Sequence, residues 1–229
     1  MRLNLSFNKH YILSMPMIKD KVYNDIFEAN KCWVKNKNAE DPEFFKNLLD
    51  DQKPDFLYIG CSDSRVHANE IMGLQPGQVF VHRNIANMVI NTDLNVLSVI
   101  NYAVLNLKVK YIIVCGHYNC GGIKAAMEFK DSGLISPWLR SIRDVYRFHE
   151  AELSLIKDET ERYKRFIELN VYEQCINVIK IREVRESFKE TGYPKIAGWI
   201  YDLHDGALND LDIDLEKEFE RIHNLFRLG

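Results

Sequence analysis

Three short apolar runs, rich in β-branched and aromatic residues, most constrain the fold of this chain. They are DFLYIG at 55–60, QVFVH at 78–82 and KYIIVCG at 110–116. Apolar side chains at successive positions over such a length predict strands that are buried on both faces of a sheet. Between the second and third runs, apolar residues recur at helical spacing from Leu94 to Leu107. Strand, helix and strand together predict a right-handed parallel crossover.

The same criteria assign the rest of the chain. The sequence PKIAGWIYDLHDGALNDLDID predicts two further strands joined at His204-Asp205-Gly206. Helical patterns are predicted at 20–37, at 41–52, at 121–129, at 136–156, at about 159–189 and from Leu215 onward. The predicted fold class is therefore α/β, with a mostly parallel central β-sheet flanked by helices and an N-terminal helical arm. Since no Gly/Pro/Ser-rich linker divides the chain, we expect a single domain at 18–229, preceded by a candidate N-terminal extension at 1–17.

Net charge and cysteine spacing limit the expected binding partners and the expected cellular compartment of the protein. The net charge is −3, and basic residues are interspersed with acidic ones, so nucleic acid is not an expected partner. No apolar run reaches the roughly 18 residues of a membrane span, so a membrane partner is not expected either. Five cysteines form an odd set without the spacing of a disulfide framework, which is typical of a reducing compartment. We expect a cytoplasmic location, with a short N-terminal targeting segment as the alternative.

Cys61, His117 and Cys120 are candidate ligands for a zinc ion. Zn²⁺ accepts thiolate and imidazole ligands in tetrahedral geometry, and catalytic zinc sites use three protein ligands and leave the fourth position open. His117 and Cys120 share one Gly-flanked loop, and Cys61 follows directly after another predicted strand. In parallel sheets, ligands bind beyond the carboxyl ends of the strands. Two adjacent strands would therefore bring the three side chains together.

A second ligand set, in which Cys115 replaces Cys61, also satisfies the spacing. It leaves the cysteine, carboxylate and guanidinium cluster at 61–65 unexplained. Cys115 lies inside the apolar run IIVC, whereas Cys32 and Cys175 lie in helical patterns. We expect all three of these cysteines to be structural.

Asp63 and Arg65 follow Cys61 at alternate positions. A carboxylate beside a metal can hydrogen-bond a water on the metal or replace it as a ligand, and an arginine can hold that carboxylate ionised by bidentate hydrogen bonds. The alternative is an ordinary ion pair at the start of a helix, because Ser-Asp-Ser is also good N-cap chemistry. The residues by themselves leave both interpretations open.

Three blocks of sequence resemble the signature of the β-class carbonic anhydrases. They are CSDSRV at 61–66, VHRNIANMV at 81–89 and CGHYNCGG at 115–122, and GWIYDLHDG follows at 198–206. The similarity extends from about Trp33 to Leu211. Cys-x-Asp-x-Arg combined with a distant His-x-x-Cys is more specific than either half.

This resemblance implies a cofactor, a reaction and an assembly. One Zn²⁺ per subunit would be held by Cys61, His117 and Cys120, with Asp63 and Arg65 as catalytic residues. The reaction would be the reversible hydration of CO2 to bicarbonate and a proton, by attack of zinc-bound hydroxide on CO2. The subunits would form a homodimer or a dimer of dimers, with the active site at the dimer interface. Substrate-binding positions implied by motif matching are Gln52, Val66, Phe80, Tyr102 and the backbone N–H of Gly121.

The chain departs from some members of this family. Members with a second bicarbonate site have an inactive state in which the aspartate becomes the fourth zinc ligand, the role Asp63 would then take. Those members carry tryptophan where this chain has Tyr58, and proline is common where it has His67, whereas Arg83 matches. We therefore expect Asp63 to pair with Arg65. The rival functions are a CS2 or COS hydrolase on the same scaffold, and a structural or regulatory zinc protein.

Overall fold

The computed structural model describes residues 20–49, 51–128 and 130–226, and the chain divides into two compact units at 1–50 and 51–229. The first unit contains helices α1 (Lys21–Glu40) and α2 (Phe44–Asn47). Asp20 caps α1 by accepting a hydrogen bond from the backbone N–H of Tyr23. No residue of α1 is buried. The predicted helical arm is therefore present, and the candidate extension at 1–17 lies outside the described residues.

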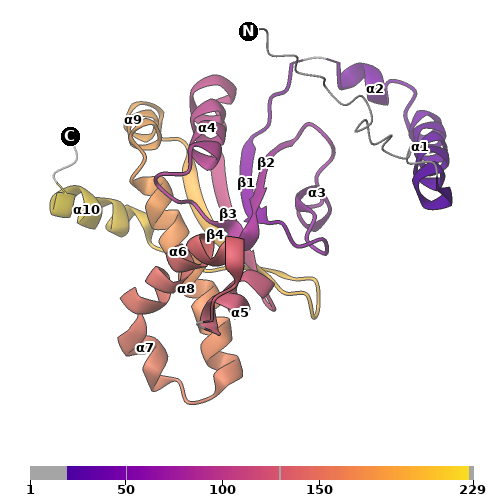
Figure 1. Cartoon of the computed structure of the whole chain (residues 1–229). Helices are drawn as coiled ribbons and strands as arrows, with labels where there is room; N and C mark the ends of the chain where they lie inside the picture. Colours follow the sequence, from indigo (N-terminus) through magenta and orange to yellow (C-terminus); the bar gives the residue numbers. More distant parts are fainter. Residues whose placement is uncertain (1–19, 50, 129, 227–229) are drawn as a thin grey trace, which may run out of the picture. The chain divides into compact units, whose positions relative to one another are not determined.

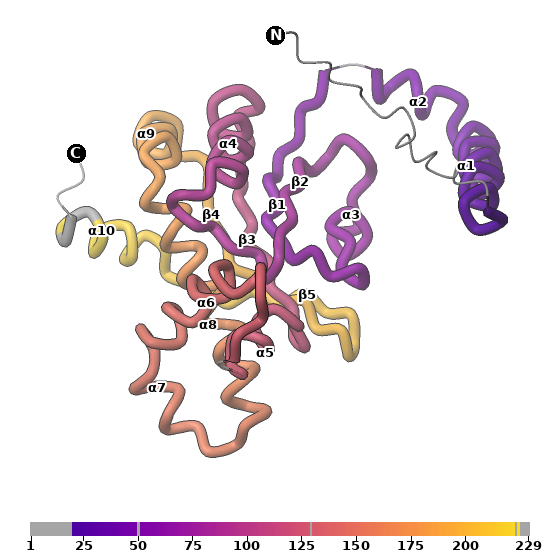
Figure 2. The backbone as a smooth tube through the Cα atoms, viewed as in Figure 1, coloured from indigo at the N-terminus to yellow at the C-terminus, as the bar shows by residue number. Residues whose placement is uncertain are grey.

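The second unit is built on a five-stranded sheet in the order β2-β1-β3-β4-β5 (Figures 1 and 2). Strands β1 to β4 are parallel, and β5 is antiparallel to β4, which confirms the predicted mostly parallel sheet and its final hairpin. The strands are β1 (Phe56–Cys61), β2 (Val79–Asn84), β3 (Tyr111–His117), β4 (Lys195–Tyr201) and β5 (Leu208–Asp210).

Strand register places the first two candidate ligands at one edge of the sheet. β1 and β3 are neighbours, and Gly60 pairs with Cys115. Cys61 is thus the last residue of β1, and His117 ends β3 close beside it. The adjacency expected from the crossover is confirmed, because the segment from β2 to β3 passes over β1.

The two faces of the sheet pack against hydrophobic clusters of different size. Leu57 and Ile59 of β1 face the main core, together with Ile112 and Val114 of β3. The alternate residues, such as Tyr58, face a smaller cluster. Figures 1 and 2 show α5, α6 and α8 close together, as their contacts confirm. The helices of this unit are α3 (Ala68–Ile71), α4 (Leu94–Tyr102), α5 (Gly121–Met127), α6 (Ser136–Phe148), α7 (Glu150–Leu155), α8 (Glu159–Ile179), α9 (Arg182–Thr191) and α10 (Leu215–Phe226).

Four helical predictions need correction in detail. The helix predicted at 41–52 is confined to Phe44–Asn47, and the segment at 136–156 is two helices, α6 and α7, on either side of His149. α4 does not continue as an α-helix to Leu107; it passes into a π-helical turn, η2 (Ala103–Leu107), and ends where Lys108 adopts a left-handed φ of 53°. The segment at 159–189 is two helices, because the chain turns at Lys180 and Ile181 between α8 and α9. Neither of these last two breaks is marked by glycine or proline.

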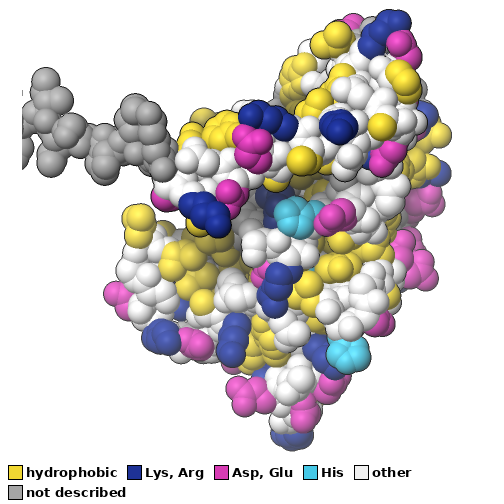
Figure 3. All heavy atoms as spheres, turned by 90° about the vertical axis from the view of Figure 1, so that its right-hand side faces the viewer, with side chains coloured by type: hydrophobic (Ala, Val, Ile, Leu, Met, Phe, Trp, Pro, Cys, Tyr) yellow, Lys and Arg dark blue, Asp and Glu magenta, His cyan; other side chains and the backbone are white. Residues whose placement is uncertain are grey.

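Two burial predictions were wrong for the single chain. β2 is not buried on both faces, because it lies at the edge of the sheet and the side chain of Val81 is 38% exposed. Cys32 is exposed on α1 instead of packing in a core, whereas Cys115 and Cys175 are buried as expected. Among the described helices, none has the length and apolarity needed to cross a membrane. Figure 3 shows acidic and basic side chains interspersed on one face of the molecule.

Candidate metal centre

Cys61, His117 and Cys120 meet at the carboxyl ends of β1 and β3. Cys120 immediately precedes α5, so the short loop after β3 turns its side chain back toward the strand ends. The ligand atoms of the three residues all lie within 4.8 Å of one another, and all three side chains are buried. The two sulfur atoms are 3.9 Å apart. The loop and the neighbouring strand thus assemble the predicted set.

One ring nitrogen of His117 is committed to the backbone and the other is not. Nδ1 lies 2.9 Å from the carbonyl oxygen of Tyr118, to which it can only donate a hydrogen bond. Nε2 therefore carries the lone pair, and it is buried without a hydrogen-bond partner. A buried, unpartnered nitrogen beside two thiols fits a metal ligand, and the bond from Nδ1 to a carbonyl is the usual way to orient such a histidine.

Backbone N–H groups surround the two thiols. Hydrogen bonding to the Cys120 thiol, with smaller contributions from the backbone N–H groups of Ala86 and Asp63, lowers the pKa of Cys61 against the effect of burial. The pKa of Cys120 is raised, because its proton is shared with Cys61 and because it is buried. The pair thus favours one thiolate, and a bound cation would favour the second.

Asp63 lies beside this cluster and is held by Arg65. Arg65 Nε is 2.9 Å from Asp63 Oδ1, and Nη2 is 2.7 Å from Oδ2. These side-chain hydrogen bonds lower the pKa of Asp63 below its usual range. Asp63 Oδ2 is 3.8 Å from His117 Nε2. The predicted pair is present, with its carboxylate ionised and directed toward the cluster.

Cys115 belongs to the core and not to the cluster. Its thiol is 3.4 Å from the carbonyl oxygen of Gly116, and it packs with Tyr58 and Ile113 on the face of the sheet opposite Ile59. Burial raises its pKa to about 12, so it stays a thiol at neutral pH. The set that the structure brings together therefore contains Cys61 and not Cys115.

Known proteins with this fold share the arrangement of elements and much of the sequence. The carbonic anhydrase family model matches residues 56–208. A curated carbonic anhydrase of Emericella nidulans is 56% identical over 209 residues, which cover 90% of this chain and 92% of that protein. The chain belongs to the β-carbonic anhydrase family.

Two solved β-carbonic anhydrases superpose closely on it. The enzyme of Aspergillus fumigatus is 37% identical with a TM-score of 0.84, over 91% of this chain and 100% of that one. A tetrameric enzyme of Sordaria macrospora is 39% identical with a TM-score of 0.81, over 85% of this chain and 98% of that one. The resemblance seen in the sequence is confirmed, and this chain is a carbonic anhydrase, whose general reaction is CO2 hydration.

The residues expected from the sequence to bind substrate lie in two places in this β-carbonic anhydrase. Val66 is buried in the loop after β1, where its backbone N–H donates to the carbonyl oxygen of Asp63. Gly121 is the first residue of α5, directly after Cys120. Both therefore adjoin the cluster along the chain. Gln52 is exposed ahead of β1, and no contact joins it to the cluster within the described part of this chain.

The rings of Phe80 and Tyr102 contact each other at a distance from the candidate metal ligands of the same chain. Their ring centroids are 5.9 Å apart, and the rings come from β2 and α4. Register pairs Phe80 with Leu57, four residues before Cys61, which is roughly 13 Å along the strand. Within one chain, the aromatic pair and the cluster lie toward opposite ends of β1.

Two residues near the carbonic anhydrase cluster have contacts that sequence analysis did not predict. Arg83 donates from Nε to the carbonyl oxygen of Cys61 at 2.8 Å and from Nη2 to that of Asp63 at 2.6 Å. The hydroxyl of Tyr163, on α8, donates to the carbonyl oxygen of Cys120 at 2.7 Å. From the sequence, Arg83 could be recognised only because it matches the family pattern. Nothing in the sequence around Tyr163 indicates more than a helix.

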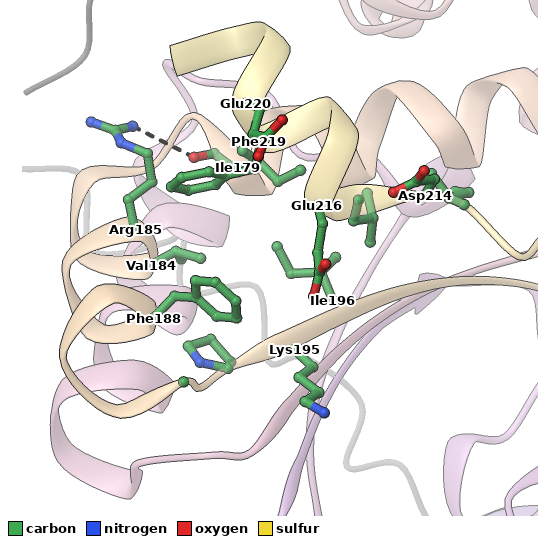
Figure 4. A pocket seen from close by; sticks show the side chains of 14 residues that line it. Ile179, Val184, Arg185, Phe188, Lys195, Ile196, Asp214, Glu216, Phe219 and Glu220 are labelled. Carbon is green, nitrogen blue, oxygen red and sulfur yellow. Dashed lines mark hydrogen bonds between the residues drawn. The ribbon is translucent and has the colours of Figure 1, made fainter. Parts of the chain in front are cut away.

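A separate hollow of about 540 Å³ lies between α9, α10 and β4 of this carbonic anhydrase. Figure 4 shows Val184, Phe188, Ile196 and Phe219 around it. None of the three cluster residues lines it. Its charged groups do not converge, because Figure 4 shows the Arg185 guanidinium and the Lys195 amine turned away from its centre.

Proposed function

We propose that this carbonic anhydrase catalyses the reversible hydration of CO2 to bicarbonate and a proton with one Zn²⁺ per subunit, held by Cys61, His117 and Cys120. The observation that carries this proposal is the pair of sulfur atoms 3.9 Å apart beside the unpartnered Nε2 of His117. Tetrahedral zinc with Zn–S distances near 2.3 Å requires two thiolates about 3.8 Å apart. When bound, Zn²⁺ supplies a Lewis acid that makes water nucleophilic near neutral pH.

The three ligands suit a catalytic zinc site better than a structural zinc site, in which four protein ligands close the coordination. Three protein ligands leave one tetrahedral position open. Asp63 is the side chain that could close it, but its oxygens are both occupied by Arg65. The geometry supports the open state of the site and thus catalysis over a structural zinc role.

Asp63 and Arg65 have distinct proposed roles. Arg65 keeps Asp63 ionised and fixes the direction of its carboxylate. Asp63 Oδ2 then accepts a hydrogen bond from the attacking water, which directs the lone pair of the water toward CO2. Preorganised groups of this kind act without reorganising during the reaction.

The substrate pocket is proposed to combine apolar walls with two hydrogen-bonding groups. CO2 is linear and apolar, so Val66, Phe80 and Tyr102 would supply the walls. Gln52 and the N–H of Gly121 would hydrogen-bond the oxygens of bicarbonate. CS2 and COS have the same linear shape, so comparing turnover on CO2 with turnover on these analogues would separate the rival hydrolase function from the proposed one.

We propose a homodimer or a dimer of dimers as the active assembly. Phe80 lies beside Leu57, four residues before Cys61, so the Phe80 and Tyr102 pair is too far from the cluster to line the pocket of its own chain. A second copy could place the two rings at its site. The edge strand β2 and the neighbouring helix also expose apolar side chains that a second copy would cover, including Val81, Tyr102 and Leu105. The tetramer of the Sordaria macrospora relative supports the same assembly. A cytoplasmic location is proposed because all five cysteines are free thiols.

Metal content and CO2 hydration rate of the purified chain test the proposed function. We expect one zinc per chain and rapid hydration in a stopped-flow assay. Cys61→Ala should lose both zinc and activity, because a thiolate ligand is removed. Cys115→Ala is the matched control, since it removes a buried thiol from the neighbouring strand without touching the cluster.

The outcomes separate the rival assignments. Zinc retained in Cys61→Ala but lost in Cys115→Ala would favour the other ligand set. Zinc bound at one per chain without CO2 hydration would favour a structural role. Activity without any metal would contradict the proposed mechanism.

A further inference from the structure

The turn that follows β2 has an uncommon backbone conformation. In η1 (Ile85–Asn87), Ala86 has a φ of 64° and Asn87 a φ of 49°. The left-handed region costs alanine about 1 to 2 kcal/mol relative to the right-handed one, whereas asparagine adopts it more readily. Both residues are buried. Two such residues in succession persist only where the surrounding structure holds them.

This turn lies beside the two segments that carry the cysteine ligands. Asn84, directly before the turn, accepts a hydrogen bond at 2.9 Å from the backbone N–H of Ser62, the residue after Cys61. Ile85 and Ala86 also lie against Gly122, where a Cβ would be 2.7 Å from Ile85 Cγ2 and 3.3 Å from Ala86 Cβ. Gly122 lies two residues after Cys120. The turn is thus hydrogen-bonded next to one candidate ligand and packed next to the other.

Helix α8 holds the turn through two buried amide side chains. Asn170 Nδ2 donates to the carbonyl oxygen of Ala86 at 3.1 Å. One helical turn later, Gln174 Oε1 accepts from the backbone N–H of Val89 at 2.9 Å. Gln174 Nε2 is 3.4 Å from Asn170 Oδ1, so the two amides also support each other.

The two amide side chains that hold the turn are buried, so the loss of their hydrogen bonds would be costly. Asn170 is only 1% exposed, and Gln174 is fully buried. A buried amide is costly unless it is hydrogen-bonded, and an apolar side chain would be the simpler choice at a core position. The amides therefore specify the turn and do more than fill space.

We propose that Asn170 is a positioning residue of the metal centre, which holds the left-handed Ala86 turn against the segments that carry Cys61 and Cys120. The inference rests on the proposed function in one respect, that Cys61 binds the metal. Groups that hydrogen-bond or orient metal ligands typically change metal affinity 10- to 100-fold when removed. Asn170 acts from the opposite side of the turn, without contact to the metal or the substrate.

Asn170→Ala tests this proposal, with Val178→Ala as the matched control. Val178 is fully buried on the same helix but has no part in holding the turn. We expect Asn170→Ala to release zinc to a chelator roughly 10-fold faster than the wild type or more. Its cobalt-substituted form should also show an altered thiolate-to-cobalt absorption band. Val178→Ala should leave both readouts unchanged although it lowers the melting temperature.

A second change distinguishes positioning from core packing. Glycine adopts a φ near 64° without strain. Adding Ala86→Gly to Asn170→Ala should therefore slow zinc release again, because a glycine turn needs less support. If Asn170 only fills space in the core, adding Ala86→Gly should leave zinc release as fast as in Asn170→Ala. Gln174→Met provides the same test if Asn170→Ala does not fold, and should speed zinc release by removing the second anchor.

Three results would overturn the inference: zinc release from Asn170→Ala no faster than from Val178→Ala, no recovery on adding Ala86→Gly, or unchanged release from Gln174→Met. The wild type separates these from a failure of the proposed function. A wild-type chain without zinc and without a thiolate-to-cobalt band would refute the proposed metal site itself. A normal band in the wild type with insensitive variants would refute only the role of Asn170.

Discussion

Arg65 binds both oxygens of the Asp63 carboxylate, with its Nε 2.9 Å from Oδ1 and its Nη2 2.7 Å from Oδ2. The same carboxylate has Oδ2 3.8 Å from Nε2 of His117. The side chain of Asp63 is 17% exposed, so the pair lies at the edge of the buried cluster. One ion pair therefore fixes the direction of a carboxylate beside three candidate metal ligands.

Removal of the Asp63 carboxylate should separate catalysis from metal binding. We expect Asp63→Ala to lower kcat/KM for CO2 hydration by about 10²-fold, a usual effect of losing a positioned proton acceptor. Zinc content should stay at one per chain, because Cys61, His117 and Cys120 remain. Elemental analysis and stopped-flow assays measure the two quantities.

Asp55→Ala is the control for this change. Asp55 also forms an ion pair, with Lys110, but both side chains are more than half exposed. The control should keep both zinc and rate. Loss of zinc in Asp63→Ala would instead mean that this carboxylate closes the site as a ligand.

The Asp63–Arg65 pair predicts a pH dependence of stability. Side-chain hydrogen bonds from Arg65 lower the pKa of Asp63 in the folded chain below its ordinary value of 3.8. Such a group favours the folded state above pH 3.8, and the contribution is lost as the pH falls through the lower folded value. The difference in unfolding free energy between wild type and Arg65→Met should thus be constant from about pH 5 to about pH 8 and shrink below about pH 4. Urea unfolding at each pH measures it, and a difference that grows in acid would contradict this account.

Arg83 should support both the geometry and the stability of the segment after β1. It donates to the carbonyl oxygens of Cys61 and Asp63, the two residues on either side of Ser62. A hydrogen bond from a charged group contributes about 1.5 to 3 kcal/mol, and Arg83→Met removes two of them, so the variant should be destabilised by at least about 1.5 to 3 kcal/mol. We also expect kcat to fall more than KM rises, because Asp63 loses its backbone support.

Arg182→Met is the control for Arg83→Met. Arg182 forms an exposed ion pair with Glu186 on α9, which is worth little to stability. Urea unfolding and steady-state kinetics of the two variants should differ clearly. Equal effects would show that loss of an arginine charge, and not the two carbonyl contacts, is responsible.

The proposed assembly makes a prediction about mass in solution. Leu105, in η2, is 51% exposed in the single chain, next to Tyr102. If a second copy covers this surface, Leu105→Glu should shift the mass measured by light scattering from a multiple of 26.9 kDa toward 26.9 kDa. Leu155→Glu is the control, because Leu155 is also exposed but lies on α7. A wild-type chain of 26.9 kDa would refute the proposed dimer.

Much of the candidate metal centre was predictable because its residues lie at or just after the carboxyl ends of strands. Apolar runs located β1 and β3, and the carboxyl ends of neighbouring parallel strands meet at one edge. Cys61 and His117 could therefore be expected together from the pattern. The pairing of Asp63 with Arg65 was also predictable, because they lie two residues apart in a loop.

The supporting residues were not predictable for physical reasons. Asn170 lies in a helical pattern, where a polar residue is more often exposed, and only its tertiary contact with Ala86 reveals its burial. Nothing in the type of residue 86 signals a left-handed φ, because alanine normally avoids it. The exposed face of β2 was predicted as buried, since apolar residues such as Val81 give the same pattern whether their own chain or a second copy covers them.

The closest packing near the site involves Gly60 and Tyr58 of β1. A Cβ at Gly60 would lie 2.2 Å from Cε1 of the Tyr58 ring, which is fully buried against Ile113 and Cys115. The ring cannot move aside without disturbing that cluster, so Gly60→Ala should lower the free energy of unfolding by about 1 to 3 kcal/mol. Adding Tyr58→Leu removes the ring atoms that would collide. The double variant should then be more stable than the sum of the two single effects predicts.

Gly121→Ala is the stability control for Gly60→Ala. A Cβ at Gly121 would meet nothing within 4 Å, and alanine favours the helix that begins there. Urea unfolding should therefore give Gly121→Ala a stability equal to or above that of the wild type. If Gly60→Ala were equally stable, or if the effects of Gly60→Ala and Tyr58→Leu were simply additive, contact with the Tyr58 ring would not be the reason that β1 has glycine one residue before Cys61.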